Sequence, residues 1–168
     1  MALQTPIESL YPEFRAYALS LCGNPDEAED LLQDAVERAL RADSCPGRPE
    51  ELRPWMFRVI RNLHYDELRK RRVRREYLAA EKRLLSEGGW STDHARDVLF
   101  RQAFGKLRPE IREILFLVDV MGLKYAEVAT VLDVPQGTVM SRISRARRAL
   151  LALVDGGSEA GPKAKEDG

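Results

Sequence analysis

Residues 124–150, KYAEVATVLDVPQGTVMSRISRARRAL, decide the fold of the C-terminal part of this chain. Apolar side chains recur three and four positions apart over residues 125–132 and again over residues 139–150, which predicts two helices. Between them lies Asp133-Val134-Pro135, and the residue before a proline is disfavoured in the α conformation. Two helices joined by so short a turn are typical of a helix-turn-helix.

The second of these helices has an apolar back, formed by Val139, Ile143, Ala146 and Leu150, and a basic front. The side chains of the front and its edges are Thr138, Met140, Ser141, Arg142, Ser144, Arg145 and Arg148. Residues 135–154 contain four arginines and no acid, so this charge is not balanced locally. The DNA major groove admits such a helix, and phosphates attract its arginines. DNA is therefore the expected ligand, and the alternative is a helical hairpin with solvated arginines.

Charge is segregated along the chain although its 168 residues have a net charge of zero. Residues 1–40 carry eight acids and two bases, and residues 41–85 carry thirteen bases and seven acids. A protein that binds DNA by itself is usually basic overall. We therefore expect this chain to bind DNA together with a partner, and its acidic part to face something basic.

The sequence lacks the usual signals of a secreted protein, a membrane protein, a metal-binding protein and an enzyme. No signal peptide and no apolar run of ~20 residues occurs, so no membrane insertion is expected. Cys22 and Cys45 have no CxxC spacing and are expected to be free thiols, and His64 and His94 are weak metal-ligand candidates. No nucleophile–base–acid set or phosphate loop appears, so we predict no catalytic residue, no metal and no cofactor.

Helical periodicity without a strand pattern predicts an all-α protein with two small helical domains joined by a flexible linker. The predicted division is residues 1–85, a linker at 86–96, a second domain at 97–154 with the helix-turn-helix, and a disordered tail at 155–168. In the first domain we expect helices over residues 8–21, 25–40 and 52–75, the second of them capped by Asn24. Their expected core side chains are Leu10, Phe14, Tyr17, Leu21, Ala28, Leu31, Leu32, Ala35, Val36, Leu40, Trp55, Val59, Ile60, Leu63 and Leu68.

The helix over residues 52–75 carries a second basic surface. Its expected outer face consists of Arg58, Arg61, Asn62, Tyr65, Asp66 and Arg69, and a basic run continues through Arg72 to Arg75. An aromatic ring and an amide among arginines suit unpaired bases, because the ring stacks, the amide reads a base edge and the arginines hold phosphates. The alternative is a solvated basic helix end.

A third segment, DEAEDLLQDAVE at residues 26–37, has six acids and no base. It is either a solvated face or a docking face for a basic partner.

The three segments together resemble a bacterial sigma factor of the extracytoplasmic-function group, over residues 8–154. The resemblance rests on DEAEDLLQDAVERAL at 26–40, WMFRVIRNLHYDELRKRR at 55–72, and the stretch LRPEIREILF to SRARRAL at 107–150. In that group the first segment binds the clamp helices of core RNA polymerase, the second melts and reads the −10 element, and the third reads the −35 element. The group also lacks the N-terminal extension and intermediate domain of larger sigma factors.

The resemblance implies roles for particular residues. By this resemblance, the residues expected to bind polymerase are Asp30, Leu31, Gln33 and Asp34. The residues expected to bind the −10 element are Arg58, Arg61, Asn62, Tyr65, Asp66, Arg69 and Arg72, with Asn62 holding a flipped base. The residues expected to bind the −35 element are Thr138, Met140, Ser141, Arg142, Ser144, Arg145 and Arg147, with Arg142 and Arg147 on phosphates.

The resemblance also implies partners and a location: the clamp helices and flap of polymerase, promoter DNA, an anti-sigma factor, a monomeric free state and the bacterial cytoplasm. Three positions depart from the family pattern. Residues 41–53 lack the usual aromatic, Met140 replaces a common basic residue, and Lys124 replaces a Ser or Thr helix cap. The runner-up is a one-component helix-turn-helix repressor, which requires a dimer interface and an effector pocket that the sequence does not indicate.

Overall fold

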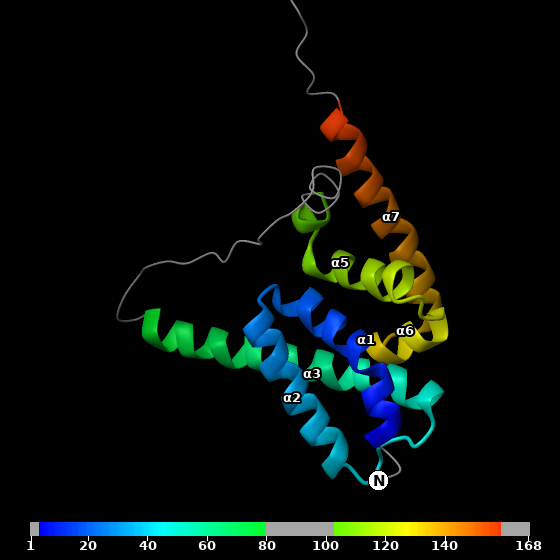
Figure 1. The fold of residues 1–168 in the computed structure, drawn as a ribbon. Coiled ribbons are helices and arrows are strands. Elements are labelled where there is room, and N and C mark those ends of the chain that lie inside the picture. Colours follow the sequence, from blue (N-terminus) through cyan, green and yellow to red (C-terminus); the bar gives the residue numbers. More distant parts are fainter. Residues whose placement is uncertain (1–3, 80–102, 159–168) are drawn as a thin grey trace, which may run out of the picture.

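The computed structural model describes residues 4–79 and 103–158, and within these ranges all regular structure is helical. The first bundle consists of α1 (Gln4–Cys22), α2 (Pro25–Arg41) and the long α3 (Pro49–Ala79), which pack against one another (Figure 1). The all-α prediction is confirmed. Residues 80–102, which contain the expected linker, and the tail from 159 onward lie outside the described residues.

The core of the first bundle is aromatic. The rings of Phe14 and Tyr17 on α1 meet the edge of Phe57 on α3 at centroid distances of 5.6 and 4.9 Å. The start of α2 follows the predicted cap, because Oδ1 of Asn24 accepts a hydrogen bond from the backbone N–H of Asp26 at 2.9 Å and Pro25 is the first helical residue.

The predicted inner face of α3 was partly wrong. Met56 and Phe57 are fully buried, whereas Trp55 and Val59 are only half-buried and Leu68 is exposed. The reason is that α3 packs against three helices, α1, α2 and α6. Its buried surface is therefore wider than the single apolar stripe that the sequence pattern predicted, and it is centred on different residues. At the end of α2, likewise, Ala39 is buried and Leu40 is 55% exposed.

The second bundle begins with a helical turn at residues 103–106 and continues with α5 (Pro109–Leu115), a π-helical turn η1 (Phe116–Val120), α6 (Tyr125–Leu132) and α7 (Gln136–Ser158). Gly122, with φ of 67°, follows the end of η1. Asp133 ends α6 in the left-handed conformation, with φ of 54°, so the predicted turn before Pro135 is present. The helix α7 continues four residues past position 154, where the second domain was expected to end.

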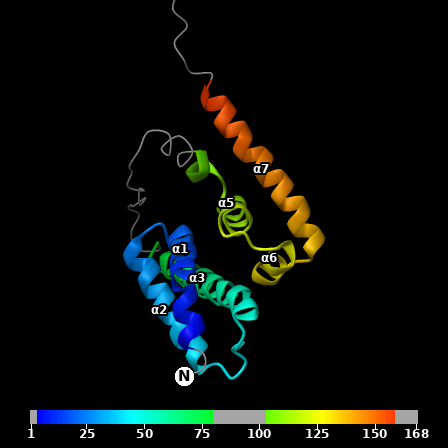
Figure 2. The ribbon, with the colours of Figure 1, turned by 45° about the vertical axis from the view of Figure 1, so that its right-hand side comes forward.

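The two bundles pack directly against each other, mainly through α3 against α6, with smaller contacts from α1 to α5 and η1 (Figures 1 and 2). Their buried side chains form one continuous apolar cluster. The helix α7 runs away from the first bundle, as the turned view shows (Figure 2).

Candidate nucleic-acid and polymerase interface

The helix-turn-helix presents the front that its sequence predicted. Val139, Ile143 and Ala146 are at most 2% exposed and pack inward. The exposed side chains of α7 include Met140, Ser141, Arg142, Ser144, Arg145, Arg147 and Arg148, and Thr138 is half-buried at the start of the helix. The helix α6 packs behind α7 and fixes its orientation. A basic helix with its polar side free and its apolar side held by a neighbour has the geometry needed to enter a major groove.

Arg147 differs from the other arginines of α7 because an acid holds it. Its Nε lies 3.2 Å from Oδ2 of Asp119 in η1, and its Nη2 donates to the other carboxylate oxygen. This hydrogen bond raises the pKa of Arg147 above its usual value. Within residues 4–79 and 103–158, the one hydrogen bond of the Arg145 side chain goes to the carbonyl of Ser141 on its own helix, at 3.3 Å. Arg145 is therefore the freer of the two for a base edge.

The start of α6 is capped despite Lys124. The backbone N–H of Lys124 donates to Oε2 of Glu127 at 2.7 Å. The carboxylate of Glu127, three residues after Lys124, thus satisfies a backbone N–H at the helix start. This contact is half of a capping box. Although Lys124 replaces the usual Ser or Thr, the backbone N–H at the helix start still has a hydrogen-bond acceptor.

A hollow of about 470 Å³ opens on α3 in the first bundle. Its lining residues are Arg38, Trp55, Arg58, Val59, Asn62, Asp66 and Arg69. Four of the predicted −10 residues therefore converge on one site. The hollow combines an aromatic ring, an amide and three guanidinium groups, which is the chemistry that holds an unstacked base and its phosphates.

Sequence reasoning missed three residues of this hollow. Trp55 and Val59 were assigned to the core, although residues 55, 59, 62, 66 and 69 share one helical face, and that spacing was a usable signal. Arg38 comes from α2, and no local pattern could place it beside α3. Trp55 gives the hollow an aromatic ring, although residues 41–53 contain none.

The other predicted −10 residues lie elsewhere. Arg61 and Tyr65 point toward the second bundle, where both contact Glu113 of α5, at 2.9 and 3.3 Å. Burial, followed by the nearby carboxylate of Glu113, raises the pKa of Tyr65 to about 12, so its hydroxyl stays protonated. Arg72 is exposed and pairs with Glu76 at 2.9 Å.

The acidic helix α2 exposes Asp30, Gln33 and Asp34, whereas Leu31 is 9% exposed and belongs to the core. Three of the four residues predicted to bind polymerase thus present their side chains to solvent. Leu31 packs into the core and holds α2 against the first bundle.

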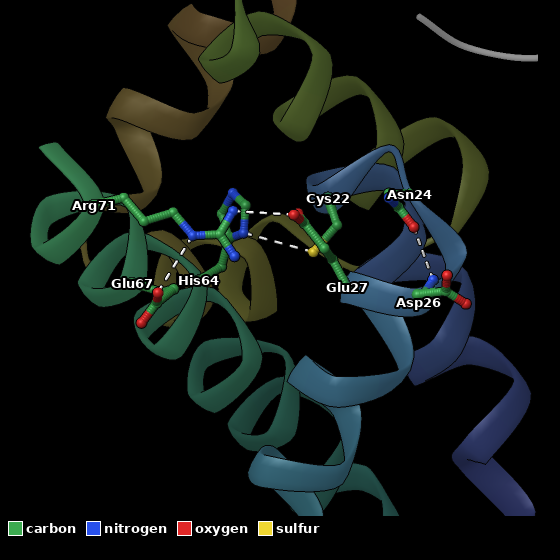
Figure 3. A network of polar contacts seen from close by, with 7 residues as sticks. All are labelled: Cys22, Asn24, Asp26, Glu27, His64, Glu67 and Arg71. Carbon is green, nitrogen blue, oxygen red and sulfur yellow. Dashed lines mark hydrogen bonds and ion pairs between the residues drawn. The ribbon is translucent and has the colours of Figure 1, made fainter. Parts of the chain in front are cut away.

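Arg71 ties the start of α2 to α3, as Figure 3 shows. Its Nη1 lies 3.1 Å from Glu27 and its Nε 3.3 Å from Glu67. Beside this pair, Sγ of Cys22 lies 3.7 Å from Nδ1 of His64. Burial raises the pKa of the Cys22 thiol to about 11 and lowers the pKa of His64, so both groups are neutral near pH 7. A thiol whose pKa is raised by burial is a weak nucleophile near pH 7.

Both cysteines are free, as predicted. Among the described residues, no group of three or more potential metal ligands occurs. Over the same residues, no helix is long and apolar enough to cross a membrane.

Comparison with known proteins agrees with this arrangement of two bundles. Residues 7–74 match the sigma-70 region 2 family, and residues 97–150 match sigma-70 region 4. The sequence is 41% identical over 169 residues to the ECF RNA polymerase sigma factor EcfG of Rhodopseudomonas palustris, covering 96% of this chain and 91% of that protein. This chain belongs to the ECF sigma factors.

Other ECF sigma factors extend the comparison. The sigma factor CnrH of Cupriavidus metallidurans is 36% identical, with 86% of this chain and 82% of that protein covered. A solved structure of the sigma factor RpoE from Bartonella quintana, in complex with the anti-sigma factor NepR, is similar with a TM-score of 0.69 at 26% identity. That comparison covers 90% of this chain and 96% of the solved chain.

Proposed function

We propose that this ECF sigma factor binds core RNA polymerase and directs it to promoters through two DNA-reading surfaces. The observation that carries the proposal is the separation of these surfaces. The exposed front of α7 fits duplex DNA, whereas the hollow beside Asn62 and Trp55 fits a single unstacked base. A chain with both can hold a −35 duplex and stabilise a melted −10 element.

In this mechanism each element has its own part. The exposed Asp30, Gln33 and Asp34 of α2 dock on the clamp helices of polymerase, and the second bundle contacts the flap. Met140, Ser141, Ser144 and Arg145 read −35 bases, while Thr138, Arg142 and Arg147 hold the surrounding backbone. The −10 strand is held by Arg58, Arg61, Asn62, Tyr65, Asp66, Arg69 and Arg72. Melting is then driven by binding energy, since extruding a base costs only a few kcal/mol.

The remaining parts of the proposal concern organisation and control. Residues 1–85 form the region 2 domain and residues 97–154 the region 4 domain, with residues 86–96 as linker. The protein works as a monomer in the bacterial cytoplasm and catalyses no reaction itself. Its relatives RpoE and CnrH were solved in complex with the anti-sigma factor NepR and with the cytosolic domain of CnrY, respectively, and we propose an inhibitor of this kind here.

The test is transcription in a reconstituted system. Purified protein is added to bacterial core polymerase with a fragmented library of the source genome, and transcript starts are sequenced. We expect starts that share two upstream motifs. Asp34→Arg should abolish them, because a reversed charge on the docking face repels the basic partner, whereas Glu8→Arg, an exposed acid on α1, should leave them intact.

Two results would contradict the proposal. Equal losses for Asp34→Arg and Glu8→Arg would reject the docking face on α2. Absence of polymerase binding, together with tight duplex binding by a dimer of this chain, would favour the one-component repressor instead.

A further inference from the structure

The C-terminal end of α3 projects from the first bundle, beyond α1 and α2 (Figure 1). Two large side chains lie exposed on this end: Val73 is 65% exposed and the ring of Tyr77 is 84% exposed. A ring so exposed adds little to folding stability, because that contribution comes from burial. Its surface is free to contact a partner.

These two side chains continue the helical face that bears the hollow of the first bundle. The members of this face are three or four positions apart, at residues 55, 59, 62, 66, 69, 73 and 77. A shallow groove of about 500 Å³ lies along the far part of the face, lined by Arg69, Lys70, Val73, Arg74 and Tyr77. Because Arg69 lines both the hollow and the groove, the two sites adjoin on one helix.

The positive charges at this end of α3 differ in their partners. Arg71 and Arg72 are each paired with acids of α2 or α3. In contrast, no acid within residues 4–79 and 103–158 lies at ion-pair distance from Lys70 or Arg74. Two uncompensated cations therefore lie about one and two turns before Tyr77, where they attract an anionic ligand.

An exposed aromatic ring beside free cations has the chemistry of a single-strand site, because the ring stacks on a base and the cations hold phosphates. A paired base inside a duplex has its faces covered by its neighbours, so it has none to offer. We infer that Tyr77 forms a second single-strand subsite: its ring stacks on an unpaired base of the same strand whose flipped base enters the hollow, while Lys70 and Arg74 hold the phosphates between. This inference rests on the proposed role of the hollow in binding the −10 strand.

The length of α3 sets the distance between the two subsites. Asn62 and Tyr77 are fifteen positions apart in one helix, which corresponds to about 22 Å at the rise of an α-helix. A strand with the spacing of duplex DNA covers that distance in about six nucleotides, and a more extended strand needs fewer. Every base has a face to stack, so this subsite adds affinity and lengthens the strand that is held, without a base preference.

Four variants test the inference at exposed positions. Tyr77→Ala removes the ring, whereas Tyr77→Phe keeps it. A double variant, Lys70→Gln with Arg74→Gln, removes the two free charges. Arg75→Gln is the matched control, because Arg75 is exposed on the opposite side of the same helical turn. Circular dichroism verifies that each variant is as helical as the parent chain.

The measurement is fluorescence anisotropy of the full chain with two labelled single strands of about twelve nucleotides, twice the bridging length. One strand has a randomised sequence, and the other has the same phosphates without bases. Tyr77→Ala should lower the affinity for the first strand about tenfold and leave the second unchanged, since stacking requires a base. Tyr77→Phe and Arg75→Gln should bind the first strand like the parent chain.

The double variant should weaken binding to both strands. The loss of two phosphate contacts should also make the salt dependence shallower by about 1.4 in logarithmic slope. Affinity for random duplex DNA should stay unchanged in Tyr77→Ala, because a duplex offers the ring no free base.

Three results would overturn the stacking subsite. They are parent-like binding of the randomised strand by Tyr77→Ala, an equal loss on the strand without bases, and a loss of duplex affinity in place of single-strand affinity. Asn62→Ala separates this inference from the proposed function: unchanged binding of the randomised strand by that variant rejects the base site in the hollow, whatever Tyr77→Ala does. Absence of single-strand binding by the parent chain at low salt overturns both.

Discussion

At the scale of single residues, two neighbouring arginines of α7 have different surroundings. Arg145 lies on the exposed front and hydrogen-bonds to the Ser141 carbonyl of its own helix, whereas Arg147 is held by Asp119. A side chain that is already fixed at the edge of the helix suits a phosphate, because phosphate contacts set position and carry no sequence information. A free guanidinium on the front suits a base edge.

We therefore expect Arg145→Ala to relax the preference at one −35 position by about 1–3 kcal/mol, while Arg147→Ala weakens all promoters alike. Binding to a panel of duplexes, each with one changed −35 base, measures the difference. Asp119→Ala serves as control, because it frees Arg147 and should cost less than about 1 kcal/mol of folding stability, as expected for a partly exposed pair. Equal losses on every duplex for both arginine variants would reject the assignment.

At the scale of elements, the passage from η1 to α6 depends on one glycine. Gly122 has φ of 67°, where a side chain is strained, and a Cβ there would meet no atom within 4 Å. The backbone N–H of Leu123 then donates to the carbonyl of Leu117 at 3.0 Å, which closes the end of the π-helical turn. The strain of the backbone, and not crowding, therefore requires glycine at this position.

Gly122→Ala should lower the free energy of unfolding by about 1–2 kcal/mol, the cost of a left-handed conformation for a residue with a Cβ. Gly137→Ala is the matched control, since that glycine lies in α7 with equal open space and no positive φ. It should be neutral or raise stability by up to about 1 kcal/mol. Chemical denaturation followed by circular dichroism measures both, and equal effects would contradict this explanation.

At the scale of the whole molecule, the chain has no net charge but has separate acidic and basic surfaces. The acidic face of α2 and the basic front of α7 belong to different bundles, and part of the basic surface of α3 is occupied by Glu113 and Asp133. The free chain therefore offers few unpartnered cations to duplex DNA. Tight binding to a promoter needs both surfaces at once, which polymerase can arrange.

The salt dependence of duplex binding tests this distribution. With Arg142, Arg147 and Arg148 on phosphates and Arg145 on a base edge, about three phosphates should be neutralised by α7. The logarithm of the association constant should then fall with the logarithm of salt concentration with a slope of about −3. A much steeper slope would mean that the arginines of α3 also contact duplex DNA in the free chain.

The sequence by itself determined the helices, most of their boundaries and the residues of the basic front of α7. These are local properties: the spacing of apolar residues, the cap at Asn24, the turn before Pro135 and the glycine at position 122 act over a few residues each. The front of α7 was predicted residue by residue, because a helix held from one side has one exposed face. The same local reasoning placed the acidic face of α2.

The tertiary structure alone decided which face of α3 is buried and how its polar residues divide. With neighbours on more than one side, α3 buries Met56 and Phe57, opens Trp55 into a hollow with Arg38, and turns Arg61 toward Glu113. Contacts between residues distant in sequence have no periodic signature. They depend on how two bundles pack, and that packing is set by burial and charge pairing across the whole chain.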